Sequence, residues 1–98
     1  MNRNDAIRQL QQHADAVQSM GATALYLFGS TVRDEAGAPS DLDLFIDYDP
    51  GKRFSLLDLV SIKQFLEEKL SIEVDVTTRN SLHPMLRTDI EKSAVRVF

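Results

Sequence analysis

The segment Asp41 to Tyr48 (DLDLFIDY) constrains the fold more than any other part of the sequence. Its aliphatic residues Leu42, Leu44 and Ile46 alternate with acidic or aromatic ones, and this period of two predicts a β-strand. Successive side chains of a strand point to opposite faces of a sheet. The segment therefore predicts a sheet with one aliphatic face, covered by other elements, and one face that carries carboxylates.

The other segments predict the elements that surround this strand. The apolar run Ala22 to Phe28, which ends at Gly29, is typical of a central strand, and residues 72–77 (IEVDVT) alternate again. Apolar spacing predicts three helices: one between Asn4 or Asp5 and Gly21, one from a Ser55–Asp58 capping box to Leu70, and one that starts near Pro84. One or two helical turns are expected over residues 30–36, and a short strand over 94–98. The sequence thus predicts a single domain over residues 1–98 of the α/β (α+β) class, a small mixed β-sheet flanked by helices.

Composition limits the classes of function. A formal net charge of −4 argues against non-specific binding of nucleic acid, which needs clustered Lys and Arg. The sequence contains no cysteine, which excludes disulfides and thiolate metal sites and agrees with a cytoplasmic location. No apolar run approaches the length of a membrane span, so we expect no membrane partner.

The acidic residues are the candidate metal ligands. Asp41 and Asp43 share one face of their strand, with Cα atoms about 6.5–7 Å apart, and hard oxygen ligands favour Mg²⁺ or Mn²⁺. Asp75 would add a third carboxylate if residues 72–77 neighbour that strand. Three acids suit two metal ions, which stabilise the attacking and leaving oxygens of a displacement at phosphorus. Asp41, Asp43 and Asp75 are therefore the candidate catalytic and metal-binding residues.

The turn after the first strand is the candidate phosphate site. Gly29 allows close approach of the backbone, and Ser30 opens a predicted helical turn, where N–H groups and the hydroxyl can donate to phosphate oxygens. Arg33 lies one turn later and is equally compatible with a phosphate contact and with a surface ion pair. Ser40 either contributes to the site or only shapes the turn.

These residues together carry a resemblance. They spell G-S-x-x-R and then S-D-x-D-L, through Gly29, Ser30, Arg33, Ser40, Asp41, Asp43 and Leu44. This pattern resembles the nucleotidyltransferase motif of the DNA-polymerase-β-like superfamily, and so short a chain is most similar to the minimal nucleotidyltransferases. The resemblance implies that the G-S turn binds the triphosphate, that the paired acids hold metal and that Asp75 completes the site. Asp34 departs from the usual pattern, because it adds negative charge beside the expected phosphate.

The resemblance also implies a function. The expected reaction is transfer of AMP from ATP to a hydroxyl of a partner protein. The expected partner is a HEPN-domain toxin, which this chain would neutralise as its antitoxin. The alternative is a non-catalytic inhibitory or nucleotide-sensing subunit of a two-protein complex. Other polar residues are expected on the surface, in loops or at helix caps; these are His13, Asp47, Lys52, Arg53, Glu73 and His83.

Overall fold

The computed structural model of the protein describes residues 2–29 and 42–98. Its elements follow in the order α1 (Arg3–Gln12), α2 (Ala14–Ser19), β1 (Ala22–Phe28), β2 (Leu42–Tyr48), α3 (Leu56–Leu70), β3 (Val74–Thr78), the 3₁₀ helix η1 (Arg79–Ser81), α4 (Pro84–Ser93) and β4 (Val95–Arg96). The strands form one four-stranded sheet in the order β3-β2-β1-β4. β2 and β3 are parallel, whereas β1 is antiparallel to β2 and to β4. The predicted small mixed sheet with flanking helices is confirmed.

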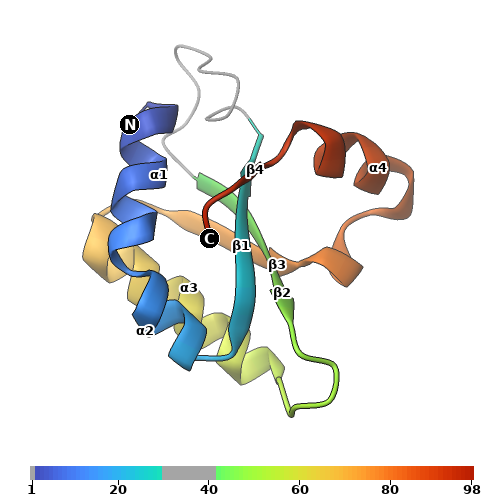
Figure 1. The fold of residues 1–98 in the computed structure, drawn as a ribbon, viewed down its shortest axis with the longest axis horizontal. Helices are drawn as coiled ribbons and strands as arrows, with labels where there is room; N and C mark the ends of the chain where they lie inside the picture. Colours follow the sequence, from blue (N-terminus) through green and yellow to red (C-terminus); the bar gives the residue numbers. More distant parts are fainter. Residues whose placement is uncertain (1, 30–41) are drawn as a thin grey trace.

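The aliphatic face of β2 lies in the core, as its alternation predicts. Leu42, Leu44 and Ile46 are at most 1% exposed. Helices α1, α2 and α3 lie together on one side of the sheet, and α4 lies apart from them (Figure 1). The buried side chains that these helices bring to the core are Ala6, Leu10, Val17, Ile62, Leu66 and Leu70. The opposite face of the sheet is therefore without this helical layer.

The N-terminal helical region differs from the sequence prediction. In place of one helix, α1 and α2 are separated at His13, whose φ of −108° and ψ of 13° lie outside the helical range. The His13 N–H bonds to the Leu10 carbonyl, a tighter connection than the α-helical one, and its ring packs edge-on against Phe65 at 5.6 Å. The cap is also earlier than Asn4 or Asp5, because the Asn2 side chain accepts from the Asp5 N–H at 2.9 Å.

The C-terminal half follows the predictions more closely. The Ser55–Asp58 capping box is present, and Pro84 lies in the first turn of α4. His83 caps that helix, since its Nδ1 accepts from the Met85 N–H at 3.2 Å. β3 begins at Val74 rather than Ile72, because α3 ends in a left-handed residue, Ser71, with φ of 57°. None of the described helices is long and apolar enough to cross a membrane.

Candidate active site

The sheet face without the helical layer carries the acidic and aromatic side chains. On β2, Asp43, Phe45 and Asp47 occupy the positions opposite to the buried aliphatic residues. Register pairing brings Phe28 beside Asp43 and Tyr26 beside Phe45 on the neighbouring β1. This face therefore has carboxylates at both ends of β2 and aromatic rings between them.

Asp43 and Asp75 lie side by side. They are register partners in the parallel pair of β2 and β3, and strands in a sheet are about 4.7–4.9 Å apart. Asp43 is half-buried and Asp75 is exposed. Two facing carboxylates repel one another unless a cation or a proton lies between them. The condition left open by the sequence, that the strand of Asp75 neighbours the strand of Asp43, is met, and the arrangement suits a divalent cation.

Gly29 lies against the Asp43 carboxylate. Its φ is +84°, a conformation that residues with a side chain rarely adopt. A Cβ atom built on Gly29 would overlap the Oδ2 atom of Asp43 and would lie 3.3 Å from its Cγ. Both the backbone angle and the lack of space therefore require glycine, and the end of β1 is brought next to the carboxylate pair.

Four predicted site residues, Ser30, Arg33, Ser40 and Asp41, lie outside the described residues, as does Asp34. In residues 2–29 and 42–98, no three Asp, Glu or His side chains are grouped closely enough to hold a metal ion. The described part of the candidate site thus consists of Gly29, Asp43 and Asp75.

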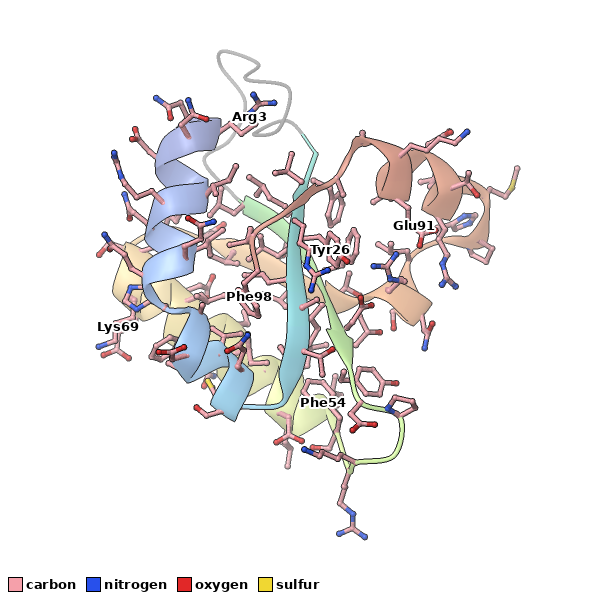
Figure 2. The ribbon with its side chains drawn as sticks, in the orientation of Figure 1. Arg3, Tyr26, Phe54, Lys69, Glu91 and Phe98 are labelled. Carbon is pink, nitrogen blue, oxygen red and sulfur yellow. The ribbon has the colours of Figure 1, made fainter. Side chains whose placement is uncertain are left out.

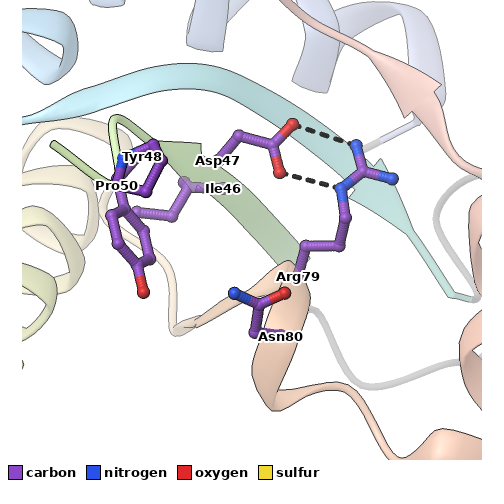
Figure 3. Close-up of a pocket in the computed structure, with 6 residues that line it drawn as sticks. All are labelled: Ile46, Asp47, Tyr48, Pro50, Arg79 and Asn80. Atoms are coloured by element: carbon purple, nitrogen blue, oxygen red, sulfur yellow. Dashed lines mark hydrogen bonds and ion pairs between the residues drawn. The ribbon is translucent and has the colours of Figure 1, made fainter.

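The environment of Asp47 differs from the sequence-based prediction. The sequence predicts a solvated carboxylate at the strand end. In the structure, Arg79 Nε donates to Asp47 Oδ1 at 2.8 Å and Arg79 Nη2 donates to Asp47 Oδ2 at 3.0 Å (Figure 3). The two residues, with Ile46, Tyr48, Pro50 and Asn80, line a pocket of about 130 Å³. The hydrogen bond to Asp47 raises the pKa of the Arg79 guanidinium, which therefore stays charged. Glu73, Lys52 and Arg53 are exposed as expected.

Arg79 is the polar residue of this face that the sequence did not reveal. Its guanidinium lies over the rings of Tyr26 and Phe45, at 4.9 and 5.0 Å from their centroids, and it also donates to Glu91 on α4. Figure 2 shows Tyr26 at the centre of the sheet and Glu91 on the side of α4. No periodicity marks Arg79, because it follows β3 in a 3₁₀ helix.

Known proteins resemble this chain in sequence and in fold. The family model of the nucleotidyltransferase domain matches residues 10–97. A candidate protein adenylyltransferase of Methanocaldococcus jannaschii is 47% identical over 78 residues, which are 80% of this chain and 82% of that protein.

Two solved structures are similar to this chain in fold. The structure of a candidate minimal nucleotidyltransferase superposes with a TM-score of 0.71 at 33% identity, covering 97% of this chain and 95% of that one. A chain from the complex of a tri-AMPylated Shewanella oneidensis HEPN toxin with an MNT antitoxin has a TM-score of 0.67 at 15% identity, covering 94% of this chain and 71% of that one, which shows a shared fold. The chain therefore belongs to the nucleotidyltransferase domain family and resembles its minimal members.

Proposed function

We propose that the protein transfers AMP from Mg-ATP to a hydroxyl group of a partner protein. The observation that carries this proposal is the register pairing of Asp43 with Asp75, with Gly29 held against the Asp43 carboxylate. A carboxylate pair beside a glycine turn provides both a place for metal and a place for phosphate. The name of the M. jannaschii relative, a protein adenylyltransferase, supports AMP as the transferred group.

The residues present fit a divalent cation. Asp43 and Asp75 offer hard oxygen ligands on adjacent strands, and Asp41 precedes β2 on the same alternating pattern. We propose Mg²⁺ as the physiological ion, two ions as the number and Mn²⁺ as a substitute. When bound, the metal would stabilise the charge of the attacking and leaving oxygens. Gly29, Ser30, Arg33 and Ser40 are the proposed contacts of the triphosphate.

The reaction follows from these roles. The acceptor hydroxyl oxygen forms a bond to the α-phosphorus of ATP, and the bond from that phosphorus to the oxygen bridging the α- and β-phosphates breaks. Pyrophosphate leaves with the electron pair of the broken bond. Asp75, the more exposed carboxylate, is proposed to take the acceptor proton directly or through water. Backbone N–H groups at the Gly29-Ser30 turn are proposed to stabilise the charge on the leaving pyrophosphate.

The proposed partner is a HEPN-domain toxin that this chain neutralises as its antitoxin. The S. oneidensis complex, in which a HEPN toxin carries AMP, supports the pairing. Surface apolarity supports a protein contact, because Leu56 and Leu57 at the start of α3 are 74% and 77% exposed. We further propose that residues 1–98 form one domain and that it works in the cytoplasm, where ATP and Mg²⁺ are available.

The test is to mix the purified chain with Mg-ATP and the protein encoded by the adjacent gene, which the proposal expects to be a HEPN-domain protein, and to measure the intact mass of both proteins. The proposal expects the partner to gain whole AMP units and expects Asp43→Asn to abolish the gain. Asp89→Asn, at an exposed position on α4, is the matched control and should leave the gain unchanged. A stable complex without any mass gain would instead support a non-catalytic inhibitory subunit. ATP binding with neither a complex nor a mass gain would support a nucleotide sensor.

A further inference from the structure

We propose that Arg79 is a positioning residue, which through its paired hydrogen bonds to Asp47 holds β3 in the register that keeps Asp75 beside Asp43. The proposal rests on the proposed function only for what the carboxylate pair binds. The register itself is a property of the sheet.

The first observation is the position of β3 in the sheet. Among the described strands it is an edge strand of five residues, and β2 is its hydrogen-bonded neighbour there. A slip of one residue would turn Asp75 to the opposite face, and a slip of two would move it about 6.6 Å away from Asp43. The function of the carboxylate pair therefore depends on the register of an edge strand.

The second observation is how each end of this register is held. At the start of β3, the Leu42 N–H donates to the Glu73 carbonyl, and the Glu67 carboxylate accepts from the Val74 N–H at 3.0 Å. At the other end the last register pair is Ile46 with Thr78. Asp47 and Arg79 follow as the next pair of positions, and they are joined by two side-chain hydrogen bonds. Arg79 thus continues the ladder between β2 and β3 beyond the last backbone pair.

The third observation is the packing of the face itself. Asp75 and Thr77 are the side chains that β3 presents there, and neither is apolar, so hydrophobic contact does not fix the strand on this side. The Arg79 side chain, in contrast, is 24% exposed, and its guanidinium lies over Tyr26 and Phe45. Cation–π contacts of this kind favour one position of the guanidinium on the sheet. Arg79 therefore anchors the end of β3 to both β2 and β1.

Arg79 is too far from the carboxylate pair to contact it directly, so we infer that it acts through β3. Asp43 and Asp47 are about 13 Å apart along β2 at the usual rise. The Arg79 charge is already matched by Asp47 and Glu91. A direct role in holding phosphate would require the guanidinium to leave both carboxylates.

The test uses Arg79→Gln, Asp47→Asn and the double variant, with Arg87→Gln as the matched control. Arg87 also contacts Glu91, at 3.4 Å, but it joins no strands. The readouts are Mn²⁺ affinity by electron paramagnetic resonance, Mg-ATP affinity by calorimetry, and hydrogen exchange of the β3 amides, all in the full chain at a temperature where it is folded. We expect each single variant to exchange its β3 amides faster and to bind Mn²⁺ about tenfold more weakly, as for other residues that orient metal ligands.

The double variant separates positioning from direct contact. If Arg79 acts through the position of β3, any further loss of Mn²⁺ and ATP affinity in the double variant should be accompanied by faster exchange of the β3 amides, because Arg79 also contacts Tyr26 and Phe45, and Arg87→Gln should match the wild type. If Arg79→Gln weakens ATP binding further in the Asp47→Asn protein without any change in β3 exchange, Arg79 contacts the nucleotide and the proposal is wrong. Wild-type β3 exchange in both single variants would overturn it equally. A wild-type chain that binds no Mn²⁺ would refute the metal assignment under the proposed function, whereas the exchange measurement would still decide the role of Arg79.

Discussion

Replacing Gly29 with alanine should damage both the fold and the site, and the two effects can be measured separately. The backbone angle alone, φ of +84°, costs a residue with a side chain about 1–2 kcal/mol. In a domain of this size each kcal/mol lowers the melting temperature by about 4–8 °C. The added methyl group also overlaps Asp43 Oδ2, so the carboxylate has to rotate away from its place beside Asp75.

Gly21 provides the matched control. It also has a positive φ, +117°, and a Cβ there would meet the Phe54 ring at 2.8 Å from Cδ2. Gly21 precedes β1 and Gly29 follows it, so the two substitutions strain opposite ends of the same strand. Gly21→Ala should therefore lower the melting temperature by a similar amount without moving the carboxylate pair.

The assay combines thermal melts with Mn²⁺ and Mg-ATP titrations carried out well below each variant's melting temperature. Both variants should melt earlier than the wild type, and only Gly29→Ala should bind metal and nucleotide more weakly. Equal affinities in the two folded variants would mean that Gly29 only ends the strand. An unchanged melting temperature in Gly29→Ala would refute the backbone argument.

Three further predictions concern single side chains. Asp43→Asn and Asp75→Asn should each weaken Mn²⁺ binding, because each removes a carboxylate of the register pair. Asp75→Asn, at the exposed member of the pair, should also leave the metal-free melting temperature equal or higher, because it removes a charge that faces Asp43; a lower metal-free melting temperature would contradict this. A hydrogen bond from Lys63, and to a smaller extent one from the Val74 N–H, lowers the pKa of Glu67 below its ordinary 4.5. The stability that these bonds contribute is therefore complete above pH 4.5 and is lost as the pH falls through the lowered pKa. Urea titrations should therefore show Glu67→Gln to be less stable than wild type at pH 7 and the difference to shrink in acid. Ser55→Ala should lower the free energy of unfolding by about 1 kcal/mol through loss of the capping box of α3, as measured by urea titration.

The sequence predicted the elements whose side chains alternate or recur with one clear period. The period of two in β2 identifies both its buried face and its acidic face, because each residue of a half-buried strand is either covered or exposed. Likewise the Ser55–Asp58 box predicts where α3 begins. For Asp43 and Asp75 the sequence gives only the face of each strand. Their adjacency depends on strand order, which the alternating pattern leaves open.

The features that were missed depend on contacts between residues distant in sequence. Arg79 and Asp47 are far apart in the chain and have no pattern in common, so their pairing emerges only when β2 and β3 lie side by side. The break at His13 is similar, because apolar residues on both sides of it keep helical spacing while its ring is held by Phe65 on α3. Tertiary contacts of this kind override local propensity.

The sheet face that carries the site is stabilised differently from the face that carries the core, and this difference explains why a functional site can lie there. Phe45 is completely buried, although α1, α2 and α3 pack against the opposite face of the sheet. Among the described residues, the Tyr26 ring stacks on it at 4.7 Å and 17°, the Phe28 ring lies 5.7 Å from it, and the Arg79 guanidinium lies over it. These contacts cover the apolar centre of the face. At its end, Asp43 is half-buried and Asp75 is exposed. A helix packed across the whole face would have buried two carboxylates at a cost of several kcal/mol each, so a short local cover allows one face to hold both an apolar centre and a partly exposed acidic end.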